Sequence, residues 1–320
     1  FLATSKQSSY SYNRLLAVDG AMIRSDIFGS NTLVIGGVLA GTMNPGVRTD
    51  NLAYRIYADF PNDFINHFIG YRVVEGHFDP QMGFADRTGF RKYSYTFEIR
   101  PRPEGIGVQY LEFKPIELDY YTNMDGSTQS MDYEGRLLGF RTNSGESFEW
   151  NIQRFADSPT DSITFFGNSI VPSTYWWTRW ELQVQTNQNR SVSFFALYSW
   201  GGFYNGNRQR YMFQPLARLG GNFSLGVDYT RNMVQLPTGG FITDEAGASL
   251  NYGFSPLLNS SLFGQWNNED NQMNLNLRIH WIPRIGSDVY LVLNQAYTTA
   301  GRIIPTNTTI IAKIAYLFVL

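Results

Sequence analysis

Apolar and polar residues alternate along most of this chain, and the alternation is clearest near the C-terminus, from Asn271 to Ile282. The apolar positions of this stretch are Met273, Leu275, Leu277, Ile279 and Trp281, and the polar positions between them are Asn274, Asn276, Arg278 and His280. Successive side chains of a strand point to opposite faces of a sheet, so the pattern predicts a strand with one apolar and one polar face. The same apolar spacing ends the chain, at Ile310, Ala312, Ile314, Tyr316, Phe318 and Leu320.

Similar alternation recurs about every eighteen residues and predicts about seventeen whole strands, with a further strand end at Phe1–Lys6. The expected strands include Arg14–Met22, Leu33–Gly41, Leu52–Phe60, Ile65–Val74, Phe90–Arg100, Val108–Tyr121, Met131–Arg141, Val192–Trp200, Tyr211–Leu219, Ser261–Asn267 and Val289–Tyr297, of which Val192–Trp200 and Tyr211–Leu219 are more apolar on both faces. Changes of phase within Val108–Tyr121 and Met131–Arg141 predict a β-bulge in each. No stretch predicts a helix.

The expected connections alternate between short turns and longer loops. The longer set is Thr42–Asp50, Glu75–Thr88, Asn123–Ser127, Ala156–Ser173, Gly201–Arg208 and Ala300–Asn307. Such sorting is typical of a membrane barrel, whose two rims carry short periplasmic turns and longer extracellular loops. A soluble β-sandwich also alternates along its strands, but it does not sort its loops. We therefore expect an all-β, transmembrane, antiparallel up-and-down β-barrel of about 16–18 strands, forming a single domain over 1–320.

Composition supports this class. Charged residues are 16% of the chain and aromatic residues another 16%, while the mean hydropathy is −0.26. A helical membrane protein would need runs of about eighteen or more apolar residues, and the sequence has none. The absence of cysteine excludes disulfides and thiolate metal sites. A net charge of −2 indicates no nucleic-acid partner, because that function needs a concentrated basic face.

Charged residues within the expected strands mostly share the polar face. They are Arg55, Asp59, Glu98, Arg100, Asp132, Glu134, Arg136, Glu149, Arg179, Glu181, Asp228 and Arg278. In a barrel they would face the lumen, because a charge facing the bilayer midplane costs about 2–4 kcal/mol. They form either a paired lattice that packs the lumen or the wall of a water-filled path. Twenty-one of the 25 basic residues are arginine, which favours forked, fixed pairing.

Catalytic chemistry is not expected. Glu98 and Asp132 could serve as acid and base of a membrane-embedded hydrolase, but strands rich in carboxylates offer such pairs by chance. The three histidines lack metal-ligand spacing, so we expect neither a metal nor another cofactor. The glycine-rich stretch Gly201–Gly206 is interpreted as a loop. The loops Ala156–Ser173, with Phe165–Phe166 as an anchor, and Glu75–Thr88 either fold inward to constrict a lumen or cap the barrel.

One segment resembles a known family. Phe78-Asp79-Pro80-Gln81-Met82-Gly83-Phe84, followed by Arg87-Thr88-Gly89-Phe90-Arg91, is similar to the "N-P-x-x-G-F, then R-x-G-x-R" signature of certain bacterial outer-membrane proteins. These proteins, common in Bacteroidota, join an N-terminal carbohydrate-binding family 9-like domain to a C-terminal domain of unknown function. Asn13–Gly20, Ser287–Asn294 and Ala315–Leu320 also resemble family segments. Asp79 replaces the usual Asn, and Leu320 the usual terminal Phe.

The resemblance implies an outer-membrane barrel preceded by further strands and a sugar-binding-like domain, and it assigns no role to any residue. We expect a multi-pass protein of the bacterial outer membrane, not an enzyme, acting as a pore or transport component for polar solutes such as saccharides. The alternative is a structural barrel with a packed lumen that anchors a domain or docks into a larger outer-membrane complex. The partners expected are outer-membrane lipid, other outer-membrane or periplasmic proteins, and a saccharide.

Overall fold

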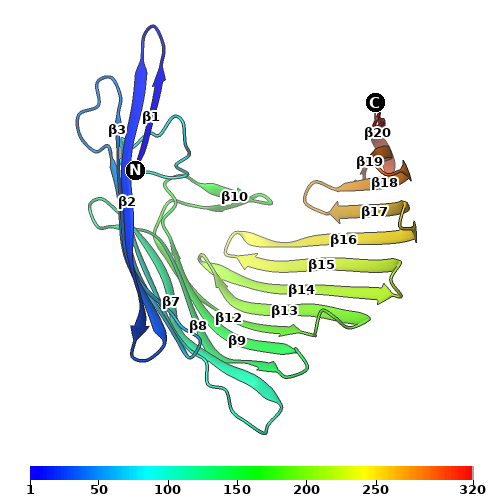
Figure 1. The fold of residues 1–320 in the computed structure, drawn as a ribbon, viewed down its shortest axis with the longest axis horizontal. Coiled ribbons are helices and arrows are strands. Elements are labelled where there is room, and N and C mark those ends of the chain that lie inside the picture. The colour runs from blue at the N-terminus through cyan, green and yellow to red at the C-terminus, as the bar shows by residue number, and fades with distance from the viewer. Residues whose placement is uncertain (319–320) are drawn as a thin grey trace. The chain divides into compact units, whose positions relative to one another are not determined.

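The computed structural model describes residues 1–318, and all regular structure in that part of the chain is β-strand (Figure 1). The strands are β1 Leu2–Gln7, β2 Tyr12–Ile27, β3 Asn31–Met43, β4 Leu52–Pro61, β5 Ile65–Val74, β6 Phe90–Ile99, β7 Val108–Asn123, β8 Thr128–Thr142, β9 Ser147–Asp157, β10 Ile163–Phe165, β11 Asn168–Ile170, β12 Tyr175–Gln185, β13 Val192–Phe203, β14 Gly206–Leu219, β15 Phe223–Leu236, β16 Gly239–Ser255, β17 Leu258–Asn267, β18 Gln272–Arg284, β19 Ser287–Thr298 and β20 Ile304–Ala315. Over residues 1–318 there is no helix long and apolar enough to cross a bilayer.

Eighteen of these strands belong to one antiparallel sheet, and β10 and β11 form a separate hairpin. Neighbours in sequence pair from β1 to β7 and from β14 to β20. β9 pairs with β12, because the small hairpin is inserted between them. The expected all-β, antiparallel, up-and-down architecture of about 16–18 strands is confirmed.

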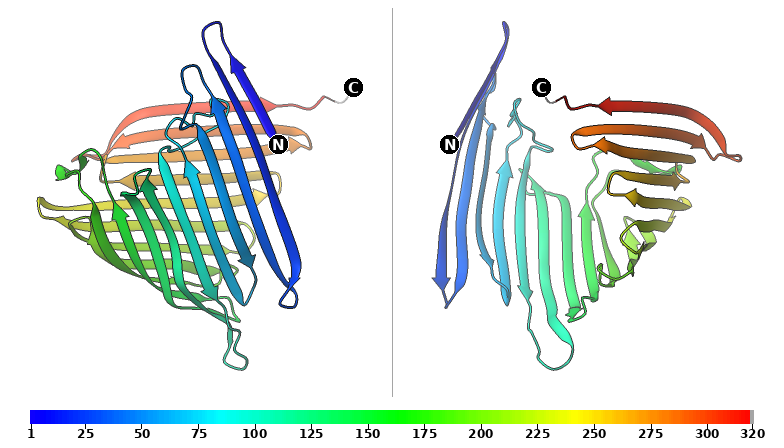
Figure 2. Two further views of the ribbon diagram at one scale, coloured as in Figure 1. Left: turned by 90° about the vertical axis from the view of Figure 1, so that its left-hand side faces the viewer. Right: turned by 45° about the vertical axis from the view of Figure 1, so that its right-hand side comes forward.

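The chain divides into two compact units. The first contains Phe1–Phe140, Glu149–Trp180 and Gly202–Asn205, and the second contains Arg141–Phe148, Glu181–Gly201 and Gly206–Leu320. Within the first unit the strands from β2 to β8 lie side by side (Figure 2). Within the second, β14 to β18 form a ladder of neighbouring strands (Figure 1).

Strand register in the first unit separates a polar face from an apolar face, because direct cross-strand partners share a face. One row of partners across β4–β7 is Arg55, Arg72, Lys92 and Tyr121, and the adjacent row is Ile56, Tyr71, Tyr93 and Tyr120. Register in the second unit does the same for the C-terminal stretch. Leu277 lies opposite Leu262 and Leu293, while Asn276 lies opposite Asn294. The apolar face expected from alternation is confirmed, whereas the polar face of β18 also has apolar partners, because Asn276 lies opposite Phe263 and Arg278 opposite Val292.

Exposure of the two faces is unlike that of a water-soluble protein. Large apolar side chains lie in the open, among them Ile56 at 61% and Ile69 at 53% exposure. Polar side chains are buried instead, including Asn151 at 0% and Glu98 at 3%. In water-soluble proteins contiguous exposed apolar surface is small, and charged residues are almost never fully buried unless paired.

Several expected details are confirmed, and the strands are mostly longer than expected. The strand end at Phe1–Lys6 corresponds to β1, and β5 has the expected bounds. β20 ends at Ala315, so Tyr316 and Phe318 follow the strand, and Leu320 lies outside the described residues. Phe97 pairs with Ile116 but Ile99 with Phe113, which gives β7 the expected bulge near Pro115. The bulge expected in β8 stays a prediction.

The expected alternation of loop length is only partly correct. In the first unit the connections over 44–51, 75–89 and 158–174 are long, but 100–107 is as long as 44–51, and the expected loop Asn123–Ser127 is reduced to the short turn 124–127. From β13 onward every connection within the described residues is short. Gly201–Arg208 is therefore not a loop: β13 continues to Phe203, and β14 starts at Gly206.

Close packing explains the glycines of this hairpin. A Cβ atom at Gly202 would lie 2.6 Å from the Trp177 Cβ, and one at Gly206 would lie 2.1 Å from the backbone oxygen of Gln235. These glycines therefore allow close approach of neighbouring strands, and they do not mark a flexible segment.

Candidate functional site

Arg136 on β8 is the centre of a group of ion pairs in the first unit. Its Nη2 lies 2.6 Å from Glu149 Oε2 and 3.4 Å from Glu134 Oε1. Its Nη1 contacts the Glu112 carboxylate, and its Nε donates to Asn151 Oδ1 at 3.1 Å. The Arg136 side chain is 11% exposed, so these contacts are largely shielded from water. One guanidinium therefore joins β7, β8 and β9 through charge-assisted hydrogen bonds.

Lys114 on β7 forms a second centre beside the first. Its Nζ lies 3.0 Å from Glu134 Oε1 and also contacts the Glu117 carboxylate. Gln153 on β9 donates from Nε2 to Glu134 Oε2 at 3.1 Å. Lys114 is buried, and burial of an ammonium group is costly unless it is paired. The two carboxylates offset that cost.

Two further ion pairs extend this polar face to β6. Arg100 Nε lies 2.7 Å from Glu98 Oε1, and Lys92 Nζ lies 2.9 Å from Asp119 Oδ2. We refer to the ten charged residues that make these contacts as the ionic network: Lys92, Glu98, Arg100, Glu112, Lys114, Glu117, Asp119, Glu134, Arg136 and Glu149. Its six carboxylates outnumber its four cations, so the network is acidic overall.

The ionic network contains five of the twelve charged residues singled out from the sequence: Glu98, Arg100, Glu134, Arg136 and Glu149. Three others, on β4 and β8 of the first unit, lie outside the network. The Arg55 guanidinium lies 4.7 Å from the centre of the Tyr57 ring. Asp59 is the cross-strand partner of Phe68, and Asp132 is exposed on β8.

The remaining four lie on β12, β15 and β18. Arg179 is buried, with its guanidinium 4.0 Å from the centre of the Phe155 ring. Glu181 is also buried and accepts a 2.6 Å hydrogen bond from Gln183 Nε2.

In the second unit, the Asp228 carboxylate occupies the space beside Gly247, where a Cβ atom would lie 2.4 Å from Oδ1. The Arg278 guanidinium lies 4.8 Å from the centre of the Tyr290 ring.

Sequence reasoning missed half of the ionic network. The bulge near Pro115 shifts the phase of β7, and this obscured the shared face of Glu112 and Lys114 with Glu117 and Asp119. A signal was present, because charged residues occupy alternate positions on each side of the proline. Lys92 was detectable directly, since it precedes Ser94 and Thr96 at the same period of two.

The connection 75–89 packs onto the polar face of the first unit. Phe78 is buried there with Leu15, Val74 and Phe90. Asn13, which is 1% exposed, donates from Nδ2 to the backbone oxygen of Asp79 at 2.7 Å. The buried Asn13 amide therefore holds the connection 75–89 against the sheet.

Backbone atoms of the Asp79-Pro80 motif join it to the sheet, while the Asp79 carboxylate accepts only a local hydrogen bond from Gln81 Nε2 at 3.1 Å. The Asp79 N–H donates to Thr42 Oγ1 at 3.3 Å, and the Gln81 N–H donates to Asn13 Oδ1 at 3.3 Å. The Gly83 N–H closes the turn onto the Pro80 oxygen at 2.7 Å. Because none of these backbone bonds uses the Asp79 side chain, either Asp or Asn at this position can form them.

The hairpin β10–β11 is held by aromatic contacts. The Phe165 ring lies 5.8 Å from that of Phe203 and 6.5 Å from that of Tyr204. The Tyr204 hydroxyl donates to Asp157 Oδ2 at 2.7 Å. Burial and the Asp157 carboxylate raise the pKa of Tyr204 above its usual value, so the hydroxyl keeps its proton. Of the expected Phe165–Phe166 anchor, Phe165 packs in this way, whereas Phe166 is 43% exposed.

Comparison with family models and with curated proteins found no match for the chain. The likeness to outer-membrane proteins with a carbohydrate-binding family 9-like domain therefore rests on its short motifs alone.

Proposed function

We propose that this chain is an integral β-barrel of the bacterial outer membrane that acts as a pore or transport component for polar solutes, with saccharides as the expected class. The observation that carries the proposal is the exposure of the apolar face. Side chains such as Ile56 and Ile69 lie open, whereas polar side chains of the opposite face are buried.

Lipid is the environment that this distribution favours. Exposed apolar surface in water costs about 25 cal/mol per Å², and the cost disappears when hydrocarbon covers the surface. A membrane-crossing strand needs about 9–11 residues, and β4, with 10 residues, is long enough. Antiparallel pairing also satisfies the backbone polar groups between strands, which a bilayer requires.

The polar face then forms the wall of the barrel lumen. Ion pairs such as Arg136 with Glu149 keep charged groups away from hydrocarbon. Hydroxyl, amide and charged groups on a lumen wall can exchange hydrogen bonds with passing solutes. The family resemblance adds the outer membrane as the location and a sugar-binding-like domain upstream.

A structural barrel is the second candidate, and the ionic network favours it. Arg136 and Lys114 are both held by carboxylates, and the connection 75–89 covers part of the polar face. A lumen filled in this way would anchor a domain or dock into a larger outer-membrane complex, without passing solute.

Conductance in planar lipid bilayers separates the two candidates. A pore gives stepwise ion conductance on insertion of the purified protein, and its current falls when a permeant saccharide enters. A protein that inserts but never conducts contradicts transport and favours the structural role. Co-purification of stable protein partners from membranes would support the structural role independently.

A further inference from the structure

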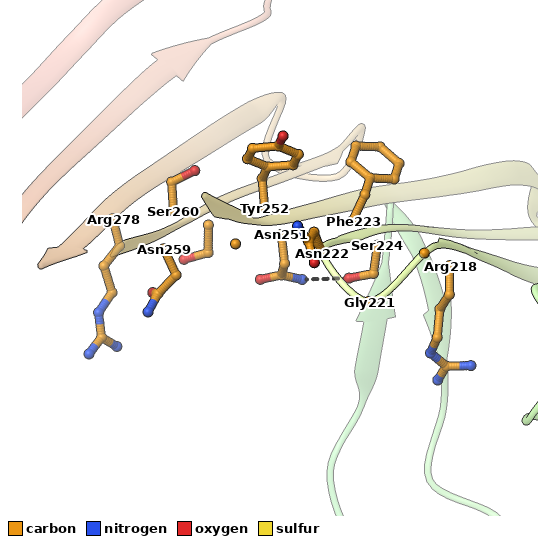
Figure 3. Close-up of a pocket in the computed structure, with 13 residues that line it drawn as sticks. Arg218, Gly221, Asn222, Phe223, Ser224, Asn251, Tyr252, Asn259, Ser260 and Arg278 are labelled. Atoms are coloured by element: carbon orange, nitrogen blue, oxygen red, sulfur yellow. Dashed lines mark hydrogen bonds between the residues drawn. The ribbon is translucent and has the colours of Figure 1, made fainter. Parts of the chain in front are cut away.

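Five polar residues form a straight row across five strands of the second unit. They are Arg218 on β14, Ser224 on β15, Asn251 on β16, Ser261 on β17 and Arg278 on β18, and each is the direct cross-strand partner of the next. In Figure 3 Arg218, Ser224, Asn251 and Arg278 point to one side of the sheet, whereas Phe223 and Tyr252 point to the other. Strands lie about 4.8 Å apart, so the two arginine Cα atoms are about 19 Å apart. We call these five residues the arginine-flanked row.

The two arginines differ from the cations of the ionic network. Arg218 donates to the backbone oxygen of Gln188, and Arg278 lies over the Tyr290 ring. Both side chains are exposed, and neither forms an ion pair with a carboxylate among residues 1–318. Their positive charges are therefore available to a ligand.

The middle of the row is neutral and rich in hydrogen-bonding groups. Asn251 Nδ2 donates to Ser224 Oγ at 3.3 Å, which leaves the exposed amide with a free N–H and a carbonyl oxygen. The row lines an open concavity of about 610 Å³. Gly221 contributes to this space, because a Cβ atom there would meet nothing within 4 Å.

We propose that the arginine-flanked row binds a linear oligosaccharide that carries carboxylate groups. Each guanidinium would receive a carboxylate in a forked, charge-assisted geometry. Ser224, Asn251 and Ser261 would exchange hydrogen bonds with the sugar hydroxyls between the two ends. A single small anion cannot reach both arginines at about 19 Å, so the row suits an extended ligand. The inference rests on the proposed function, because it names the solute class that would reach this face.

Binding measurements on the purified protein in detergent test the inference. The probes are oligogalacturonate of defined length, galacturonic acid, and a neutral malto-oligosaccharide of the same length. We expect oligogalacturonate to bind most tightly, and more weakly as salt screens the charges. Arg218→Gln and Arg278→Gln should each weaken its binding by about tenfold or more, since each removes one charged hydrogen-bonding partner.

Arg302→Gln is the matched control, because it removes the same charge from an exposed residue outside the row. It should change the affinity by less than about twofold, within the effect of a distant surface charge. Circular dichroism and heat-dependent gel migration verify that each variant is folded.

The outcomes separate this inference from the proposed function. If the protein conducts but oligogalacturonate does not bind, or binds the two row variants as tightly as the original protein, the inference is wrong and transport stands. Equal affinity for the neutral oligosaccharide also overturns it. If binding depends on Arg218 and Arg278 but no conductance is found, the row is a binding site and the pore proposal fails.

Discussion

Arg136 Nη2 lies 2.6 Å from Glu149 Oε2, and the same guanidinium contacts Glu112 and Glu134. One largely shielded cation thus faces three carboxylates from three strands. Replacement of Arg136 by Gln leaves these carboxylates without their shared partner. We expect a loss of about 3–5 kcal/mol in the free energy of unfolding, the usual effect of breaking a buried ion pair.

Urea unfolding in lipid vesicles measures this loss. Arg141→Gln is the control, because Arg141 lies on the same strand but is exposed. A loss of less than about 1 kcal/mol in Arg136→Gln would mean that the network is solvated and contributes only as much as surface ion pairs do.

Asn13 should control the position of the connection 75–89. Asn13→Ala removes the 2.7 Å hydrogen bond to the Asp79 oxygen, at a cost of about 1 kcal/mol. Amide hydrogen exchange should increase at residues 77–84, and conductance should rise if this connection narrows the lumen. Asn307→Ala, at an exposed position of β20, should leave exchange there unchanged. Unchanged exchange in Asn13→Ala would show that Phe78 packing alone is the anchor.

Gly202 should not tolerate even alanine. The added Cβ would lie 2.6 Å from the Trp177 Cβ, so the strands must separate, at a cost of about 1–3 kcal/mol. Gly20→Ala on β2 is the matched control, because no atom lies within 4 Å of its added Cβ. Thermal unfolding should show a lower midpoint for Gly202→Ala only; equal midpoints would contradict the close approach.

Acid should weaken the turn after β8. Hydrogen bonds from the Ser144 and Thr142 hydroxyls, with the nearby Arg190 guanidinium, lower the pKa of Glu146 to about 2 from its ordinary 4.5. A lowered pKa means that the ionised carboxylate stabilises the fold above its ordinary pKa, and this contribution is lost as the pH falls through about 2. The stability difference between the original protein and Glu146→Gln should therefore shrink from about pH 5 toward pH 2.

Glu269→Gln, at an exposed position in 268–271, serves as the control for this pH series. A difference that stays constant with pH would indicate that Glu146 acts through its shape and not through its charge.

The strands and their faces were predictable because a period of two is a local property of extended backbone. Leu52–Phe60 shows this: alternation alone placed Arg55 and Ile56 on opposite faces, and register with β5 confirms it. The prediction of a loop at Gly201–Arg208 was wrong. Glycine is required at position 202 because the strand packs closely against Trp177, which is distant in sequence.

The candidate site was less predictable for the same reason. The backbone oxygen of Asp79 accepts a hydrogen bond from Asn13, 66 positions earlier in the sequence, and no local pattern indicates such a contact. Glu112 and Lys114 were hidden by a bulge whose position depends on pairing with β6. Arg136 is shielded and paired only when three strands are assembled. The sequence therefore predicted the strand face on which Arg136 lies, but not its partners.

The most direct test of the central claim is thiol labelling at two neighbouring positions on opposite faces, Arg55 and Ile56. Both side chains are exposed in the structure, and the chain has no cysteine, so Arg55→Cys and Ile56→Cys each carry a single thiol. In lipid vesicles, a charged thiol reagent should label Arg55→Cys and leave Ile56→Cys unlabelled. A fluorophore on Ile56→Cys, attached before reconstitution, should be quenched by brominated lipid. Equal labelling of both positions, without quenching, would contradict a lipid-facing apolar surface and with it the membrane barrel.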